Sequence, residues 1–262
     1  MERKIVIKKY NDHHPLLKRY VHHDSKSRAF AYNTEGLTLK NTVHHRNIPI
    51  LNQGNVGSCT GNAGIGALST DQYYSYAKNI KKYSLDESGA VKLYSDAEVI
   101  DGNGSYPPND NGSCGLSIAK ALTNAGYITE YQHTFSLNDA LLALTQHPIL
   151  VGVDWYDTMF NPDADGRVHP TGKIAGGHEI VARELDDTNK RVWFDNSWGS
   201  SWGKMGRFYL TYEDFDKLLH QQGDVIVLIP KSNPAPSPAP LKDQADIELA
   251  TAMKKWFIAK GL

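Results

Sequence analysis

A glycine-rich turn over residues 53–58 leads directly into a helical pattern, and a cysteine stands at the junction. This position places the Cys59 thiol beside the unpaired backbone N–H groups and the positive end of a helix dipole. Both favour the thiolate, which is the nucleophilic form of the side chain. Free cysteines are also among the most buried residues and pack as small apolar side chains, so the position alone does not assign a role.

A second stretch, far downstream, favours a reactive cysteine. His178 follows two glycines, and Asn196 opens the sequence Asn-Ser-Trp-Gly at 196–199. Together with Gln53 and Cys59, these residues supply a nucleophile, a base, a group that orients the base and an oxyanion donor. Those are the four parts that acyl transfer by a cysteine requires.

Length and composition exclude several classes of protein. The chain of 262 residues can form one large domain or two lobes with appendages, and its formal net charge is −1. The balanced charge does not indicate nucleic acid or an anionic membrane as a partner. No apolar run approaches the ~18 residues of a membrane-spanning helix, and the first residues lack the apolar stretch of a secretion signal. Because two cysteines form no disulfide framework, we expect a reducing or redox-neutral setting, cytoplasmic or virion-associated.

The periodicity of the chain changes near its middle. The first half is mainly helical, and after Pro148 short strands alternate with turns. This predicts an α+β protein of two unlike lobes, with Cys59 in one lobe, His178 in the other and the site in the cleft between them. The expected divisions are an N-terminal extension over 1–46, a main domain over 47–230 (helical lobe about 50–135, strand-rich lobe about 136–230), a Pro-rich linker over 231–240, and an amphipathic helix over 241–262 that docks on the body or on a partner.

Individual elements follow from local patterns. Ser95, with Glu98 three residues later, has the spacing of a capping box, and Gly126 ends a helical run. Gly64 and Gly66 each cost up to ~1 kcal/mol in a helix, so we expect another element to pack closely against them. The patterns predict helices over 60–83, 93–100, 117–125 and from Ser136 onward, and strands over 149–155, 179–185, 191–194, 207–212 and 225–229.

The polar N-terminal segment contains three His-His pairs, at 13–14, 22–23 and 44–45. They suggest a metal, but no cysteine lies in this segment and no pair has the i, i+4 spacing of a helical metal site. We therefore expect no metal and no cofactor, and we predict an extended arm that packs on the body. A short inhibitory pro-segment is the alternative.

The motifs around Cys59 and Asn196 resemble those of the papain-like cysteine peptidases. That family's nucleophile motif is roughly Gln-Gly-x-Cys-Gly-Ser-Cys-Trp, and this chain keeps the spacing from Gln53 to Cys59. The motif Asn-Ser-Trp-Gly-x-x-Trp-Gly-x-x-Gly is complete over 196–206, and His178 precedes Asn196 by 18 residues. Residues 93–101 are similar to the family's Leu-Ser-Glu-Gln-x-Leu-Val-Asp segment. Four motifs in the family's order make the resemblance specific over about 48–230.

The resemblance implies a cysteine endopeptidase in which Cys59 attacks the peptide carbonyl and forms an acyl-thioester. His178 would act as the base and then protonate the leaving amine, and Asn196 would orient the imidazole ring. The Gln53 side chain and the Cys59 backbone N–H would form the oxyanion hole, where one donor contributes about 3 kcal/mol. Trp198 would shield the bond between His178 and Asn196 from water, although its position also suits a plain core aromatic.

The chain departs from the family pattern at several points. Val56 replaces a cysteine that family members usually pair in a disulfide, and Thr60 replaces the tryptophan after the nucleophile. The family's long inhibitory prodomain and its signal peptide are not recognisable. These departures indicate an intracellular member of bacterial or viral type rather than a secreted zymogen.

The resemblance also predicts a substrate-binding surface. Gly112 and Ser113 occupy the place of a Gly-Gly pair that hydrogen-bonds the substrate backbone, and Cys114 would line the main specificity pocket, unless it is a plain buried thiol. Glu179 would favour a basic side chain two residues before the scissile bond, unless it points outward or forms an ion pair. The residues assigned to substrate binding in this way are Gly57, Gly112, Ser113, Cys114, Gly177, Glu179 and Trp198.

Three functions compete at this level. The first is an endopeptidase acting on protein or peptide substrates. The second keeps the chemistry but hydrolyses peptidoglycan peptides, as a lysin does, and its modest support is the Pro-rich spacer with a C-terminal appendage. The third is a catalytically silent structural or assembly protein. The complete set of Gln53, Cys59, His178 and Asn196 argues against the third.

Overall fold

The computed structural model of the protein describes residues 17–231. The expected linker and C-terminal helix lie outside the described residues except for Lys231, and so do the first 16 residues of the expected N-terminal extension. Six α-helices and two short 3-10 helices lie in the described part. They are η1 (Ser25–Phe30), α1 (Cys59–Leu68), α2 (Asp71–Ala77), α3 (Glu87–Ile100), α4 (Gly115–Asn124), α5 (Leu137–Leu144), η2 (Asp157–Phe160) and α6 (Tyr212–His220).

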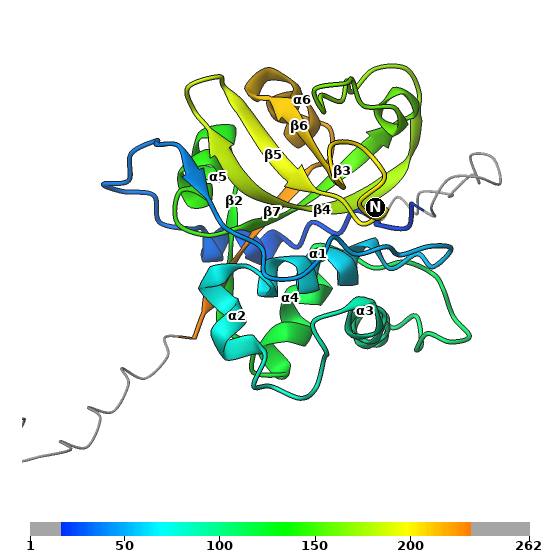
Figure 1. The fold of residues 1–262 in the computed structure, drawn as a ribbon. Coiled ribbons are helices and arrows are strands. Elements are labelled where there is room, and N and C mark those ends of the chain that lie inside the picture. The colour runs from blue at the N-terminus through cyan, green and yellow to red at the C-terminus, as the bar shows by residue number, and fades with distance from the viewer. Residues whose placement is uncertain (1–16, 232–262) are drawn as a thin grey trace, which may run out of the picture. The chain divides into compact units, whose positions relative to one another are not determined.

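Seven antiparallel strands of the described chain form one sheet in the order β2-β7-β3-β4-β5-β6, and β1 pairs with β4 outside this path. Figure 1 shows α1 to α4 gathered on one side of the molecule, and β3 to β6 with α5 and α6 on the other. The strands are β1 (Thr42–Val43), β2 (Ile128–Thr134), β3 (Ile149–Tyr156), β4 (Ile174–Asp186), β5 (Arg191–Asp195), β6 (Arg207–Thr211) and β7 (Asp224–Pro230).

The buried apolar side chains form two clusters that lie on opposite faces of the sheet. In β7, Val225 and Val227 belong to one cluster, whereas Ile226 and Leu228 belong to the other. Successive side chains of a strand point to opposite faces, so a strand that is covered on both faces must be apolar throughout. One cluster joins the sheet to α5 and α6, and the other joins it to α1 to α4. The expected α+β fold with two unlike lobes is confirmed.

Helix α1 is buried along its whole length, and its small residues allow neighbouring elements to approach. A Cβ atom added to Gly61 would lie 2.1 Å from the carbonyl oxygen of Ala90 in α3. One added to Gly64 would lie 2.8 Å from side-chain atoms of α3 and α4, and one added to Gly66 would lie 3.2 Å from Val181 in β4. The close packing that the sequence predicts for Gly64 and Gly66 is therefore present.

Two helix predictions need correction. The helix expected over 60–83 is divided into α1 and α2, because Thr70 is extended (ψ 159°) and its hydroxyl bonds the Ala67 carbonyl at the end of α1. Helix α3 begins at Glu87, and its N-cap is Asp86, whose carboxylate accepts a hydrogen bond from the Gly89 N–H. Ser95 therefore lies inside the helix and is not its N-cap. Its hydroxyl oxygen instead accepts the Tyr106 N–H at 3.1 Å.

The other predicted elements are confirmed within a few residues. Ser136 is the N-cap of α5, where its oxygen accepts the Asp139 N–H, and Gly126 follows the end of α4 with φ +79°. The five predicted strands correspond to β3, β4, β5, β6 and β7. Besides the two 3-10 helices, three elements were not predicted. These are the two-residue strand β1, strand β2, whose exposed side chains are polar, and helix α6, which Thr211 caps by accepting the Asp214 N–H.

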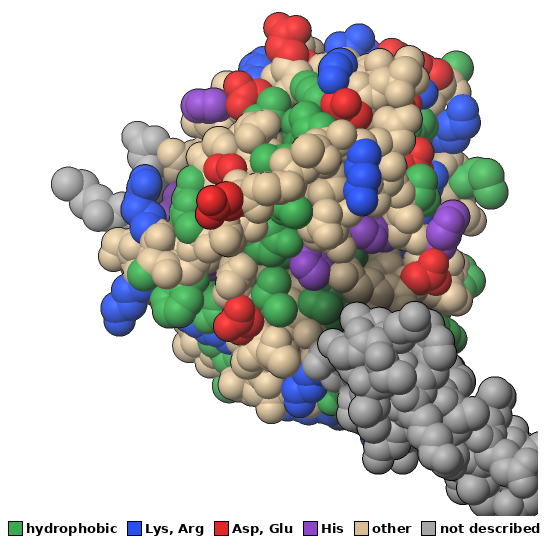
Figure 2. All heavy atoms as spheres, turned by 90° about the vertical axis from the view of Figure 1, so that its left-hand side faces the viewer, with side chains coloured by type: hydrophobic (Ala, Val, Ile, Leu, Met, Phe, Trp, Pro, Cys, Tyr) green, Lys and Arg blue, Asp and Glu red, His purple; other side chains and the backbone are tan. Residues whose placement is uncertain are grey.

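The N-terminal arm, defined as residues 17–46, lies along the body in the described structure. The Tyr32 N–H bonds the His133 carbonyl of β2, and the His44 N–H bonds the Arg183 carbonyl of β4. The expectation of an extended arm packed on the body is met within these residues. On the face that Figure 2 shows, basic and acidic side chains are interspersed and form no continuous field of one sign. Within residues 17–231, every helix is too short or too polar to span a bilayer.

Substitution of Gly61 by Ala tests the close packing of α1 on α3. The added methyl group would collide with a backbone carbonyl, which cannot rotate away, so the free energy of unfolding should fall by about 1–3 kcal/mol. Lys92→Ala on the exposed face of α3 is the control and should change it by no more than about 0.5 kcal/mol. Chemical denaturation followed by circular dichroism measures both. Equal stability of the two variants would contradict the packing argument.

Candidate active site

Cys59 is fully buried as the first residue of α1. The side chain of the N-cap residue Ser58 makes no capping hydrogen bond to the first turn of this helix. Burial raises the pKa of the Cys59 thiol to about 11, and it outweighs the backbone of Glu179, Lys18 and Thr60, which favours the thiolate. The residue is therefore a neutral thiol at neutral pH in this conformation.

His178 lies in β4 next to Glu179, and the structure brings it together with Asn196. Its Nε2 is 2.8 Å from the Asn196 Oδ1, which also accepts the Ser197 N–H at 2.8 Å. Because Oδ1 can only accept, Nε2 carries the proton and Nδ1 is the unprotonated nitrogen. Nδ1 has no hydrogen-bond partner among the described residues. Burial lowers the pKa of His178 to about 4, although the bond to Asn196 opposes this shift.

Aromatic rings enclose the imidazole. Trp198 stacks on His178 with ring centroids 4.9 Å apart and an interplanar angle of 29°, and Trp155 meets it edge-on at 5.0 Å. Both indoles are buried. Their burial gives the bond between His178 and Asn196 low-dielectric surroundings, in which a hydrogen bond is stronger, and the shielding role of Trp198 stays a prediction.

Gln53 is fixed at both ends of its side chain. Its Oε1 accepts hydrogen bonds from Ser197 Oγ at 2.7 Å and from Trp198 Nε1 at 3.2 Å, and its Nε2 donates to the Val56 carbonyl at 2.9 Å. The turn before α1 is thereby tied to the loop that carries Asn196. Sequence reasoning identified Gln53 but not these partners.

An ion cluster that the sequence did not reveal supports Asn196 from the preceding residue. Asp195 is buried, and its carboxylate accepts hydrogen bonds from Arg183 Nε at 2.9 Å and from Arg46 Nη1 at 2.9 Å. Three arginines compensate the buried charge, and they come from β4, from the N-terminal arm and from β6, where the Arg207 Nε lies 3.4 Å from the carboxylate. This cluster fixes the end of β5, from which Asn196 follows.

The N-terminal arm also fills the groove beside Cys59. The Arg19 N–H bonds the Gly177 carbonyl, and the Tyr20 N–H bonds the Ser113 carbonyl, each at 3.1 Å. A Cβ atom on Gly112 would lie 2.0 Å from the Lys18 carbonyl oxygen, and one on Gly177 would lie 2.1 Å from the Arg19 carbonyl oxygen. The groove residues predicted to bind a substrate backbone thus bind residues 18–20 of the same chain.

Lys18 continues this contact toward the nucleophile turn. Its ammonium forms an ion pair with Asp110 at 2.8 Å, and the same carboxylate accepts the Gly57 N–H at 3.1 Å. A Cβ atom on Gly57 would lie 2.3 Å from the Lys18 side chain. Because Gly57 has no side chain, the Lys18 side chain can occupy the space next to it. Gly57 therefore lies at the surface of the groove.

The side chain of Arg19 is buried in an acidic pocket. Its Nη2 donates to the Asp224 carboxylate and to the Gln222 carbonyl, and its Nε lies 3.9 Å from the Glu179 carboxylate. Burial alone would lower the pKa of Arg19, but Asp224 and Glu179 raise it above its ordinary value. Burial raises the pKa of Glu179, with the Asp224 charge adding to the shift and Arg19 opposing it. Glu179 faces the pocket, and its ion-pair partner is the arm.

Cys114 lies beside this pocket as the N-cap residue of α4. Its thiol is 2% exposed, donates to Ser117 Oγ at 3.5 Å, and feels the Asp224 charge. Burial, followed by the Asp101 charge, raises the pKa of the Cys114 thiol to about 12. The next residue, Gly115, provides the wall itself, because a Cβ atom there would lie 2.5 Å from the Glu179 carboxylate. The Cys114 thiol is buried, as the alternative expected, and the prediction that it lines the specificity pocket stays a prediction.

The structure joins His178 to Asn196 and Trp198, and Gln53 to Ser197 and Trp198, whereas the pairing of Cys59 with His178 stays a prediction. It adds Lys18, Arg19, Asp110, Asp195 and Asp224, which sequence reasoning missed. Arg19 lies in an ordinary basic segment and Asp224 at the start of an apolar strand, so neither carries a local signal. Only the folded chain shows that these two charges meet.

Comparison with known proteins identifies the fold. The chain superimposes on the cysteine protease xylellain of Xylella fastidiosa with a TM-score of 0.65 and 19% identity, over 82% of this chain and 96% of that chain. It also superimposes on a digestive procathepsin L of Tenebrio molitor larval midgut with a TM-score of 0.53 and 15% identity, over 76% and 73% of the two chains. The third comparison is the proform of the ragweed pollen cysteine protease Amb a 11, with a TM-score of 0.52 and 14% identity, over 76% and 70%. These similarities confirm the expected papain-like two-lobe fold.

The sequence comparison is more limited. A segment of 92 residues is 30% identical to a cathepsin B-like cysteine proteinase of Caenorhabditis elegans, and it spans 34% of this chain and 24% of that relative. No family model matches the chain.

Alkylation of Cys59 by iodoacetamide tests whether the arm closes the site. With a thiol pKa of about 11, about one molecule in ten thousand is a thiolate at pH 7, so labelling of the intact chain should be slow and should accelerate as the pH rises. Arg19→Ala removes the buried cation that anchors the arm. It should raise the labelling rate at pH 7 by about tenfold or more, because each 1.4 kcal/mol of lost closing free energy is a factor of ten.

Lys26→Ala, which removes an exposed cation of the same arm, is the matched control and should label like the wild type. Intact-mass measurement with Cys59→Ala as the blank assigns the modified thiol. Equal labelling rates in Arg19→Ala and wild type would contradict closure by the arm.

Proposed function

Taking the fold of the cysteine proteases as the premise, we propose that the protein is a cysteine endopeptidase that acts through Cys59, His178 and Asn196. The observation that carries this proposal is the orientation of His178. Its Nε2 is held by Asn196, and Nδ1 is left without a hydrogen-bond partner in the described structure, as a proton acceptor must be. Cys59 stands at the start of α1, and the Glu179 backbone, next to His178 in the chain, acts on the pKa of its thiol.

In the proposed reaction, the Cys59 proton passes to Nδ1 of His178 and the sulfur attacks the carbonyl carbon of the scissile bond. The imidazolium then gives this proton to the leaving amine, and an acyl-thioester remains on Cys59. Water attacks the thioester while Nδ1 takes its proton, which returns to the sulfur as the acid product leaves. The Gln53 amide and the Cys59 backbone N–H would stabilise the oxyanion in both steps.

The proposal gives the chain two states, one with the N-terminal arm bound beside Cys59 and one with the arm withdrawn. In the described conformation, burial favours the neutral thiol and the neutral imidazole, so the thiolate–imidazolium pair does not form. Withdrawal of residues 17–20 would admit water and substrate to Cys59 and His178. The pKa of the Cys59 thiol would then fall, and the pKa of the His178 imidazole would rise. We therefore assign the arm the role of an intramolecular inhibitor, the alternative that the sequence left open.

The acidic pocket supplies the proposed specificity. Arg19 inserts between Glu179 and Asp224 while its backbone bonds Gly177, so the pocket already accepts a guanidinium from an extended peptide. A substrate arginine or lysine in the same pocket would have the same partners. We assign this pocket to the side chain two residues before the scissile bond.

Hydrolysis of fluorogenic arginine-containing peptides by the Arg19→Ala chain tests the proposed residues. Cys59→Ala in that background should abolish turnover, because no other group forms the acyl-thioester. Gln53→Ala should lower kcat by about 10²–10³ through loss of an oxyanion donor. Turnover that survives Cys59→Ala would exclude the mechanism, and an inactive Arg19→Ala chain that nevertheless labels rapidly at Cys59 would exclude peptidase activity.

Profiling with a peptide library tests the specificity. Glu179→Gln and Asp224→Asn should each reduce the preference for a basic side chain in the pocket position, because each removes one of its two carboxylates. The exposed Glu35→Gln is the control and should keep the wild-type preference. An unchanged preference in both pocket variants would refute the assignment.

A further inference from the structure

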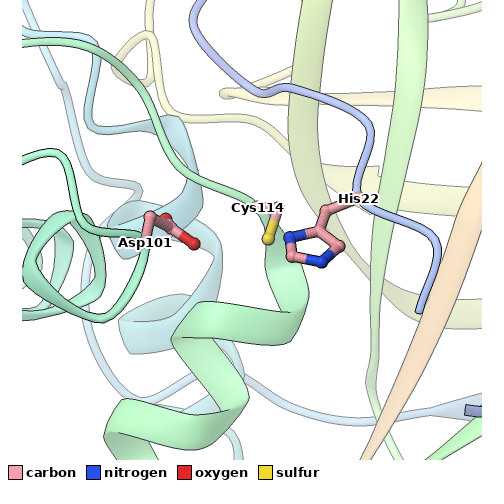
Figure 3. A group of neighbouring side chains, drawn as sticks. All are labelled: His22, Asp101 and Cys114. Atoms are coloured by element: carbon pink, nitrogen blue, oxygen red, sulfur yellow. The ribbon is translucent and has the colours of Figure 1, made fainter. Parts of the chain in front are cut away.

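A second group of reactive side chains lies next to the acidic pocket, where the N-terminal arm meets the helical side of the molecule, and it includes Cys114. His22 comes from the arm, Asp101 follows α3, and Cys114 is the N-cap residue of α4. One ligand atom from each lies within 4.8 Å of the other two. Figure 3 shows a nitrogen of the His22 ring facing the Cys114 sulfur, with the Asp101 carboxylate directed toward the same space.

We infer that His22, Asp101 and Cys114 form a zinc site that fastens the N-terminal arm over the groove. Imidazole, thiolate and carboxylate are the ligands that Zn²⁺ prefers, and bonds of about 2.0–2.3 Å place tetrahedral ligand atoms about 3.3–3.8 Å apart. The three atoms therefore need to approach by roughly 1 Å. The exposed His22 ring can supply that movement, and a water molecule can complete the tetrahedron.

The surroundings of Asp101 match those of a metal-binding carboxylate. Ser113 Oγ donates a hydrogen bond to it at 2.7 Å, Ser117 Oγ donates to its other oxygen, and the Tyr20 hydroxyl donates as well. Such outer hydrogen bonds fix the orientation of a ligand and are usual around protein metal sites. Each carboxylate oxygen has a second lone pair, so these bonds leave Asp101 able to coordinate.

Asp101 supplies the negative charge at this position, and Cys114 would become a second anionic ligand on losing its proton to solvent. A divalent ion between them would hold the thiol in its deprotonated form. Binding therefore forms bonds from the metal to nitrogen, oxygen and sulfur and releases the Cys114 proton to solvent.

The position of His22 links metal binding to the part of the arm that lies beside Cys59. Tyr20, two residues before it, bonds the Ser113 carbonyl, and Arg19 fills the acidic pocket. A metal ion held by His22 on one side and by Asp101 and Cys114 on the other would lock these residues in place. This consequence rests on the proposed peptidase function, whereas the metal binding does not. Zinc would then inhibit the enzyme by fastening its own arm, without occupying the catalytic thiol.

Metal binding by the full chain carrying Cys59→Ala tests the site without the catalytic thiol. Titration with Zn²⁺ against a chromophoric indicator should give one ion per chain, and Co²⁺ should produce a thiolate-to-cobalt charge-transfer absorption. His22→Ala should weaken binding by about tenfold or more, and Cys114→Ser should abolish the absorption. His23→Ala, which removes the neighbouring exposed imidazole, is the matched control and should bind like the parent.

Absence of binding, or binding that neither His22→Ala nor Cys114→Ser weakens, would overturn the site. Circular dichroism confirms that each variant is folded, and the exposed His22 provides a test that does not disturb the core. In the chain with Cys59 intact, Zn²⁺ should slow iodoacetamide labelling of Cys59 by about tenfold, and His22→Ala should remove this effect. Slowing that persists in His22→Ala would indicate zinc at Cys59 and His178 and would overturn the locking role.

Discussion

The close packing of α1 between α3, α4 and β4 is the constraint on which the remaining structure depends. All ten residues of this helix are buried, and its glycines meet the Ala90 carbonyl, side chains of α3 and α4, and Val181 without room for a methyl group. This contact brings the helix end that carries Cys59 to the strand that carries His178. The two halves of the candidate site thus come from different lobes, and the contact between the lobes determines their separation.

A second constraint is the burial of charge in the groove. Arg19 places a guanidinium among Glu179, Asp224 and the nearby Asp154, and Lys18 pairs with Asp110 on the other side of the nucleophile turn. Removal of one partner from such a buried set leaves an uncompensated charge, which costs more than the pair itself contributes. The arm is therefore bound by interactions that are specific and that open together. In this conformation burial favours the neutral forms of Cys59 and His178.

The sequence predicted the helices and strands whose periodicity is local, and the motifs around Cys59, His178 and Asn196 predicted the fold. It did not predict the break at Thr70 or the start of α3, because single side-chain bonds to backbone groups three residues away decide them, and the apolar periodicity does not reveal such bonds. Strand β2 was missed because its polar outer face gives no apolar run. The partners of Arg19 and the grouping of His22 with Asp101 and Cys114 join residues far apart in the chain, and no local pattern encodes them.

The most direct test of the account is the capture of the acyl-enzyme. The Arg19→Ala chain would be mixed with an activated ester of an arginine-containing peptide, quenched in acid, digested and analysed by mass spectrometry. We predict an acyl group on Cys59 that forms rapidly and is lost with time, and that does not form when His178 is replaced by Ala. Acylation of Cys114 instead, or no acylation of a folded Arg19→Ala chain, would contradict the assignment of Cys59 as the nucleophile.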